Sequence, residues 1–258
     1  MENVCKNCGN NFNGAYCNNC GQKSNVSRYT FKHIFEEVIH AFTHADKTLI
    51  GFIQKLLINP GKLAFEYIAE GKRKRYFNPF TFFLLIVAFN AFVESEDLEL
   101  KEKLFHTNNE YGHLFNVYSK VLFLVFIPIF GFITWLYHHK KPRLKFSEYT
   151  VYGMILVNAF CIVESIVHII NYIATAVTHH YYGVQNNIVY FMLMGCYFAY
   201  ADYSFHQSTP NKSLFKNLIT GFTFLLMIVA IQIFTVYAFL NNFQGLGRFD
   251  TYGIKINY

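Results

Sequence analysis

The sequence has few charged residues. Asp, Glu, Lys and Arg make up 15% of the 258 residues, against roughly 25% in an average soluble domain. Hydrophobic residues account for 53% and aromatic residues for 19%, including 30 Phe and 19 Tyr. A soluble core of this size cannot hide so many aromatic side chains, whereas a lipid bilayer accommodates them readily. The composition therefore excludes an ordinary soluble domain and predicts an integral membrane protein.

The chain also lacks a signal peptide pattern and the common catalytic motifs. Its first ten residues, MENVCKNCGN, contain no basic stretch followed by an apolar one, so we expect insertion to depend on internal helices. No H-E-x-x-H, G-x-S-x-G or P-loop pattern occurs, and no residue stands out as a nucleophile. We therefore expect no enzymatic activity.

Apolar segments fill most of the chain after residue 76. They predict an all-α membrane bundle of about five transmembrane helices, because a span needs about 20 mostly apolar residues. Asn78 and Pro79 are typical of the N-cap and first position of a helix. Segment 188–203 is short and also fits a re-entrant helix. The predicted spans, within a domain of residues 77–240, are 78–93, 121–137, 149–177, 188–203 and 218–240.

Basic residues flank these spans unevenly and predict their orientation. The loop 94–116 is acidic and residues 178–187 contain no Lys or Arg, so both are expected outside. The pattern predicts a cytoplasmic N-terminus and an external C-terminal tail, 241–258. The basic groups expected inside are Lys72 to Arg75, the cluster Lys140, Lys141, Arg143 and Lys145, and the pair Lys212 and Lys216.

Four cysteines lie in the polar segment 1–28. Cys5, Cys8, Cys17 and Cys20 follow the spacing C-x2-C-x8-C-x2-C, and a glycine follows each pair. Such turns place two sulfurs on one side of the chain, and two turns together form a tetrahedral thiolate site for structural Zn²⁺. Redox dithiols and an iron–sulfur centre are the alternatives. A site with four protein ligands has no open position, which favours scaffolding or recognition over catalysis.

Residues 29–76 have the pattern of short amphipathic helices. Apolar stripes cover 31–42 and 49–57, and a shorter one covers 63–68. We expect these helices at the cytoplasmic interface, packed on the membrane domain or in the headgroups; a small soluble helical subdomain is the alternative. The first stripe also carries His33, His40 and His44, which suit either a metal site or a solvated polar face.

The basic run Lys72, Arg73, Lys74 and Arg75 immediately precedes the first span. Such a cluster next to a membrane can bind anionic lipid headgroups, at about 1 kcal/mol per residue. The same residues also serve as a simple orientation signal without any ligand.

Glu164 and His168 lie four residues apart within span 149–177. Because a charged side chain in lipid costs roughly 2.5 kcal/mol or more, both should face the bundle interior. They suit an intramembrane proton or ion site, or a hydrogen-bonded packing pair. Asp202, near the end of the fourth span, is expected at the interface.

Several motifs in residues 5–90 together resemble a family of bacterial membrane proteins, domain of unknown function 3667. The resemblance implies a zinc-ribbon head on a multi-span domain in the bacterial inner membrane, and it implies no activity. We expect a scaffold or regulatory protein whose head binds a cytoplasmic protein partner, with no nucleic acid ligand; a small transporter using Glu164 and His168 is the alternative. The motifs are Cys5-x-x-Cys8-Gly9, Tyr16-Cys17-x-x-Cys20-Gly21-Gln22, Leu56-Leu57-x-Asn59-Pro60-Gly61, Tyr67-Ile68-x-x-Gly71-Lys72-Arg73-x-x-Tyr76 and Asn78-Pro79-Phe80.

Overall fold

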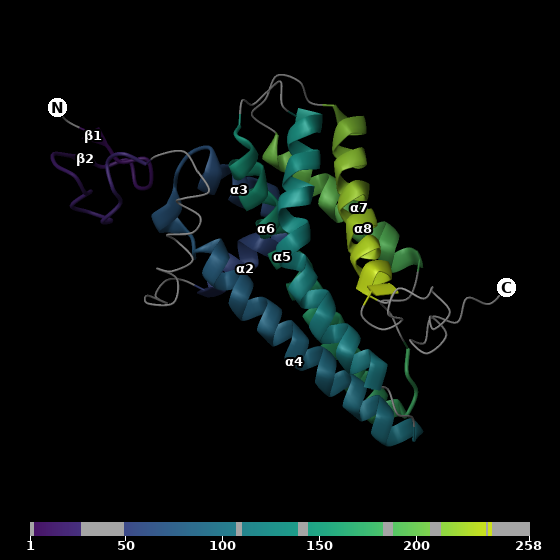
Figure 1. Cartoon of the computed structure of the whole chain (residues 1–258). Coiled ribbons are helices and arrows are strands. Elements are labelled where there is room, and N and C mark those ends of the chain that lie inside the picture. Colours follow the sequence, from purple (N-terminus) through teal and green to yellow (C-terminus); the bar gives the residue numbers. More distant parts are fainter. Residues whose placement is uncertain are drawn as a thin grey trace.

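The structure, a computed structural model, consists of a small head and a helical bundle (Figure 1). It describes residues 3–26, 49–106, 110–138, 144–182, 188–206, 213–235 and 237–238. The predicted helix 31–42 with His33, His40 and His44, the tail 241–258, and Lys140, Lys141, Arg143 and Lys212 lie outside these residues.

Two short strands and seven α-helices make up most of the described chain. The strands β1 (Asn3–Val4) and β2 (Asn11–Phe12) pair antiparallel, with Asn3 opposite Phe12. The helical elements are α2 (Leu49–Ile58), α3 (Pro60–Ile68), the 3-10 turn η1 (Arg73–Arg75), α4 (Pro79–Phe105), α5 (Glu110–His138), α6 (Phe146–Thr178), α7 (Ile188–Phe205) and α8 (Leu214–Thr235).

Four of the helical segments are long and apolar enough to cross a membrane: Arg73–Phe105, Gly112–His138, Phe146–Thr178 and Leu214–Thr235. The predicted class, a helical membrane bundle with a small knuckle at its N-terminus, is confirmed. Segment 188–203 forms α7, a helix of 18 residues, which is not one of these four. Asn78 accepts a hydrogen bond from the backbone N–H of Phe80, and Pro79 is the first residue of α4, as predicted.

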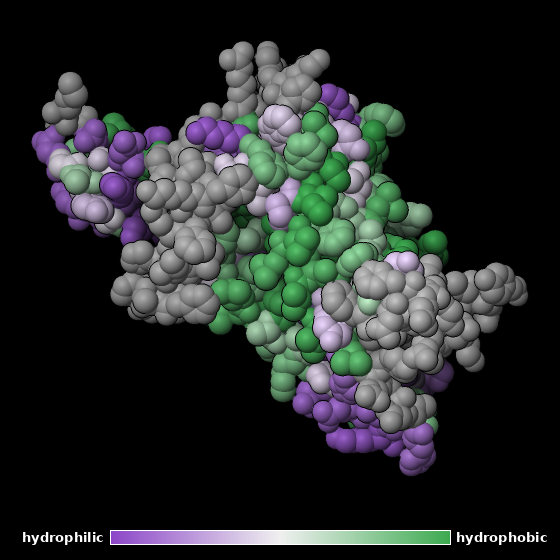
Figure 2. Space-filling model, viewed as in Figure 1, coloured by the Kyte–Doolittle hydropathy of each residue, from purple (hydrophilic) through white to green (hydrophobic). Residues whose placement is uncertain are grey.

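The helices extend well beyond the predicted apolar segments. α4 continues to Phe105 and α5 begins at Glu110, so most of the predicted loop 94–116 is helical. At 1.5 Å per residue α4 is about 40 Å long, whereas the hydrocarbon core is about 30 Å thick. Figure 2 shows a hydrophobic belt with a hydrophilic end below it, where α4 and α5 meet. Charge ends the apolar run at Glu94, but Glu, Leu and Lys still favour helix.

α6 lies at the centre of the bundle. Every residue from Ser147 to Ile162 is buried, as expected for a helix enclosed by neighbours on all sides. α4 runs parallel to its second half, since Asn158 donates to the carbonyl of Pro79 (3.0 Å) and Asn90 donates to Ser165 (3.1 Å). These contacts could not be predicted from the sequence, because they join residues more than 70 positions apart.

α3 packs into the bundle. Seven of its nine residues are buried, and Asn59 caps its N-terminus by accepting from the backbone N–H of Lys62. A Cβ atom on Gly61 would lie 1.8 Å from the carbonyl oxygen of Ala201 on α7. Small residues let two helices approach closely in this way. This packing agrees with the predicted position against the membrane domain, while the position of α3 relative to the headgroups stays a prediction.

Candidate metal centre

The two cysteine turns of the head have the same backbone geometry. The N–H of Cys5 donates to the carbonyl of Asn10 (2.9 Å), and that of Cys17 donates to the carbonyl of Gln22 (2.8 Å). The N–H groups of Gly9 and Gly21 donate back to Cys5 and Cys17, both at 2.8 Å. Both glycines have left-handed φ angles, 74° and 69°, which other residues adopt at a cost.

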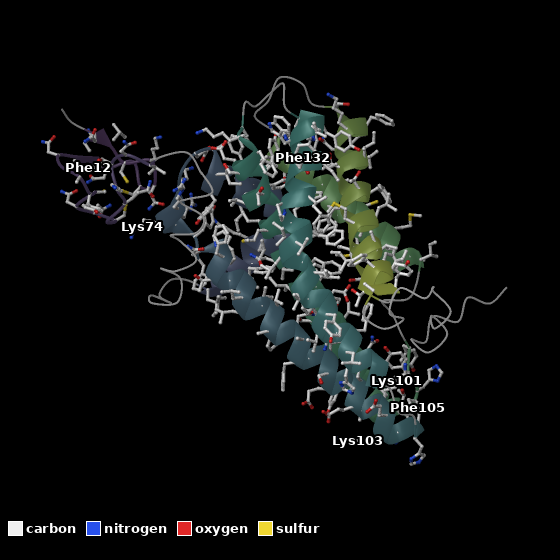
Figure 3. All side chains as sticks on the ribbon, in the orientation of Figure 1. Phe12, Lys74, Lys101, Lys103, Phe105 and Phe132 are labelled. Atoms are coloured by element: carbon white, nitrogen blue, oxygen red, sulfur yellow. The ribbon has the colours of Figure 1, made fainter. Side chains whose placement is uncertain are left out.

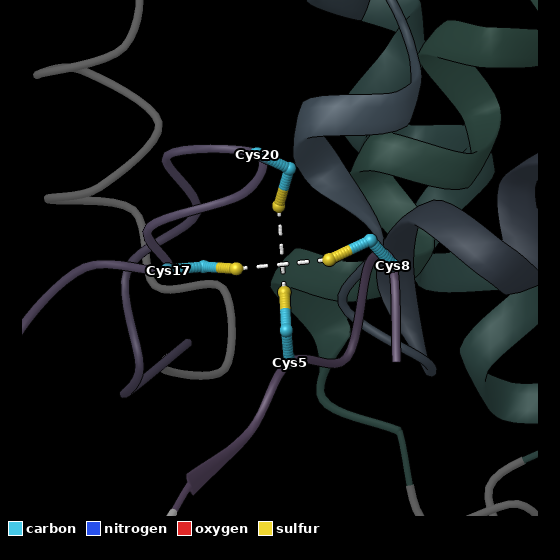
Figure 4. Close-up of side chains that lie close together, drawn as sticks. All are labelled: Cys5, Cys8, Cys17 and Cys20. Atoms are coloured by element: carbon cyan, nitrogen blue, oxygen red, sulfur yellow. Dashed lines mark hydrogen bonds between the residues drawn. The ribbon is translucent and has the colours of Figure 1, made fainter. Parts of the chain in front are cut away.

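The four sulfur atoms converge on one point (Figure 4). Cys5 Sγ lies 3.4 Å from Cys20 Sγ, and Cys8 Sγ lies 3.6 Å from Cys17 Sγ. All four lie within 4.8 Å of one another. A disulfide would need about 2.05 Å, whereas a tetrahedron of sulfurs about 2.3 Å from one ion has edges of about 3.8 Å. The thiols are placed to bind one metal ion.

Local hydrogen bonds favour the thiolate form at the second turn. Burial alone would raise the pKa of Cys20, but the backbone N–H of Gln22 and the Asn7 side chain lower that pKa to about 6. Backbone donors also outweigh burial at Cys17, whose pKa is lowered. Burial raises the pKa of Cys5 to about 11. A bound cation would displace the protons that remain, because only thiolates ligate metals.

Gln22 attaches the head to the turn before the first long helix. Its side chain is buried; it donates to the carbonyl of Gly71 (2.9 Å) and accepts from the backbone N–H of Lys74 (3.3 Å). Gln22 directly follows Cys20 and Gly21, so the second cysteine turn positions it. Burying an amide is favourable only when it is hydrogen-bonded, and these two bonds fix the head against η1. The sequence analysis did not identify this residue as an anchor.

The four predicted headgroup residues lie on and beside η1. Lys72 pairs with Glu70 (2.5 Å), and Arg75 lies 3.5 Å from Glu66. Lys74 and Arg75 are exposed, and Figure 3 shows Lys74 next to the head. The predicted basic group is therefore partly neutralised by acidic residues at the end of α3 and partly open to its surroundings.

Glu66 is the acidic centre beneath this turn. It accepts a hydrogen bond from the hydroxyl of Tyr76, and Tyr76 in turn accepts one from Lys55 (3.3 Å). Burial opposes its ionisation, but the Tyr76 hydrogen bond and the charges of Lys72, Arg75 and Lys55 outweigh burial and lower the pKa of Glu66. The basic turn is thus held by Gln22 on one side and by an ionised Glu66 on the other.

The family model described as "Protein of unknown function (DUF3667)" matches residues 46–90. This match confirms the predicted resemblance. The matched segment ends within α4, and it contains α3, Glu66 and the basic turn η1. No curated protein and no solved structure matches the chain.

Outside the matched segment, the predicted pair Glu164 and His168 belongs to a set of contacts that joins α4, α6 and α7. His168 Nε2 lies 3.9 Å from Glu164, while His168 Nδ1 lies 2.9 Å from Asp97 of α4. Glu164 accepts a hydrogen bond from Tyr190 of α7. Lys120 of α5 pairs with Glu94 at 2.7 Å. The pair therefore lies level with the charged half of α4.

Asp202, which was expected at the interface, is enclosed by protein. Its side chain is completely buried at the end of α7, between His138 of α5 and His206. Its position relative to the membrane interface stays a prediction. Its burial could not be predicted, because burial depends on which helices pack around that position.

Proposed function

We propose that this chain is a membrane-embedded scaffold in which a structural Zn²⁺ knuckle fixes a basic turn at the membrane surface. The observation that carries the proposal is the pair of Gln22 hydrogen bonds to Gly71 and Lys74. The metal would shape the second cysteine turn, that turn positions Gln22, and Gln22 holds the backbone that carries the basic residues.

Zinc is the proposed ion because of the donor set and the separation of the sulfurs. Four thiolates in a closed tetrahedron are typical of structural zinc. The short distances of 3.4 and 3.6 Å between sulfurs favour one ion over an iron–sulfur cluster, because the ligands of a cluster bind several metal atoms and lie farther apart.

The proposed location is the bacterial inner membrane, with the head in the cytoplasm and the C-terminus outside. In this orientation α7 supplies the fifth crossing. Basic residues before the first span and a net acidic segment after it support the assignment. A reducing cytoplasm would also keep the cysteines available for metal.

Two kinds of partner suit the exposed side of the turn. Lys74 and Arg75 are exposed beside the head, and such charges attract anionic lipid headgroups. The head itself exposes Tyr16, with 63% of its surface open, and exposed aromatic residues are common anchors of protein interfaces. We propose that the head binds a cytoplasmic protein partner while the turn contacts lipid.

Ion or proton transport through Glu164 and His168 is the second candidate. The observation that favours it is the chain of ionisable groups from Asp97 through His168 to Glu164 and Tyr190. The same bonds join α4, α6 and α7, which is what a packing role requires. Proton flux in vesicles should distinguish the two candidates: Glu164→Gln abolishes flux in a transporter and leaves a scaffold's partner binding intact.

The scaffold proposal is tested by hydrogen exchange of the backbone at residues 71–76. Gln22→Ala should leave the metal in place but increase exchange at Gly71 to Lys74 by about 5- to 10-fold, since each lost hydrogen bond is worth about 1 kcal/mol. Asn18→Ala is the matched control, because Asn18 is an exposed amide of the head that bonds only Asn10 among the described contacts. Equal exchange in both variants would contradict the proposal.

A further inference from the structure

A second group of metal-ligating side chains lies in the bundle, away from the cysteine head. His138 is the last residue of α5, and Asp202 and His206 lie four positions apart at the end of α7. In Figure 1 these helix ends lie at the end of the bundle opposite the α4–α5 turn. None of the three was part of a predicted site, because His138 is far in the sequence from Asp202 and His206.

The three side chains form a compact cluster around one carboxylate. His138 Nε2 lies 3.2 Å from Asp202 Oδ2, and His206 Nδ1 lies 3.4 Å from Asp202 Oδ1. The two imidazole rings stack with centroids 3.8 Å apart and planes 19° apart. All three residues are buried, with exposed fractions of 7%, 0% and 3%. Each offers one ligand atom, and these atoms lie within 4.8 Å of one another.

This arrangement suits a bound cation. Imidazole nitrogens are common metal ligands. A cation bound by the three side chains would also compensate the buried carboxylate, whose burial is costly unless the charge is paired or binds metal.

One neighbouring side chain provides a supporting contact of the kind that metal ligands usually have. The hydroxyl of Tyr152 on α6 donates to Asp202 Oδ1 (3.3 Å). The hydroxyl of Tyr149 is buried and has no hydrogen-bond partner among the described residues. Its ring stacks near His206, with centroids 6.4 Å apart. A polar atom left unpaired beside three potential ligands is what a metal-bound water would satisfy.

We propose that His138, Asp202 and His206 form a second metal site, which binds a divalent first-row transition-metal ion such as Zn²⁺ or Fe²⁺. Two imidazoles and one carboxylate are a donor set for these ions, whereas Mg²⁺ and Ca²⁺ prefer oxygen ligands alone. Three protein ligands leave at least one position for water or another small ligand, unlike the closed cysteine site. The site is independent of the scaffold proposal.

Cobalt binding to the purified full-length protein in detergent tests this proposal, because Co²⁺ replaces both ions and reports its ligands. The wild-type chain should bind two Co²⁺, one with thiolate-to-cobalt charge-transfer absorption and one without it. His206→Gln and Asp202→Asn should each lose only the second ion. Tyr152→Phe should weaken it about 10-fold, the effect typical of a supporting contact.

His113→Gln is the matched control, because His113 is also a helical histidine but bonds Ser95 and Glu102. It should retain both ions. Binding of a single thiolate-ligated Co²⁺ by the wild-type chain would overturn the proposal, and this result requires no variant to fold. Retention of the second ion by both His206→Gln and Asp202→Asn would also overturn it.

Discussion

The head and the bundle each bring metal-ligating side chains together, but by different means. In the head, four cysteines lie within 16 residues, and two identical turns aim their sulfurs at one point. In the bundle, His138 and Asp202 are 64 positions apart and meet only because α5 and α7 end at the same place. A site formed by local turns can be predicted from residue spacing in the sequence. A site formed by helix packing can be identified only from the fold.

The difference extends to how each cluster is held. The knuckle has a small core of Cys5, Cys17 and Phe12, and we expect it to depend on bound metal, as small domains with little apolar surface do. The bundle cluster is enclosed by large buried aromatic residues, among them Tyr149, Tyr152 and Phe205. Metal removal should therefore unfold the head and leave the bundle intact.

The largest effect is expected from Cys17→Ser. Loss of one of four thiolates should weaken metal binding to the head by at least about 100-fold, because binding and folding of such a small unit are coupled. Metal analysis after dialysis against a weak chelator measures this loss. Cys196→Ser is the control, since Cys196 is an exposed cysteine of α7. If Cys17→Ser kept its zinc as firmly as Cys196→Ser, the cysteine site would not be the metal centre.

Asp97→Ala should be the most damaging of the bundle variants. It leaves His168 without the carboxylate 2.9 Å away, and a buried polar group left without its hydrogen-bond partner costs about 1–3 kcal/mol. Thermal unfolding in detergent should show a clear loss of stability of the bundle, while the metal content of the head stays unchanged. Glu96→Ala, at an exposed position of the same helix, should have almost no effect. Equal melting of the two variants would argue against the network as a packing element.

Gly61→Ala should destabilise the contact between α3 and α7. The added methyl would lie 1.8 Å from the Ala201 carbonyl, and overpacking of this kind typically costs about 1–3 kcal/mol. Gly51→Ala provides a comparison, because a Cβ there meets no atom within 4 Å and alanine favours helix. Stability of the two variants in the same detergent measures the difference. A Gly61→Ala protein as stable as wild type would mean that α3 is not wedged against α7.

The smallest effect concerns the exposed basic residues. Lys74→Ala should weaken binding of soluble anionic lipid headgroups to the full-length protein in detergent by at most about 1 kcal/mol, and this difference should shrink as salt is added. Lys103→Ala, at the opposite end of α4 (Figure 3), should change nothing. An equal effect of both substitutions would indicate general charge attraction only.

Much of the fold follows from patterns that are local in the sequence. The C-x-x-C-G turns, the Asn78-Pro79 helix start and four of the five apolar segments could be predicted because each depends on neighbouring residues. Helix ends were less predictable. Hydrophobicity stops at Glu94, but the backbone hydrogen bonds of α4 continue through ESEDLELKEKLF to Phe105.

The rest depends on packing between distant residues. In the sequence Gln22 is an ordinary polar residue of the head. Its role follows only from its contacts with Gly71 and Lys74 in the folded chain. His168 was predicted to pair with Glu164, yet its shorter contact is with Asp97, in a segment assigned to a loop. The burial of Asp202 also could not be predicted from its place along one helix. No residue spacing within one helix specifies which neighbour that helix will have.

X-ray absorption at the zinc edge would test the central contrast between the two clusters most directly. With one equivalent of Zn²⁺, the full-length protein should show a shell of four sulfur atoms at about 2.3 Å. A second equivalent should add nitrogen and oxygen at about 2.0–2.2 Å without removing the sulfur shell. A first equivalent with few or no sulfur neighbours would contradict the account.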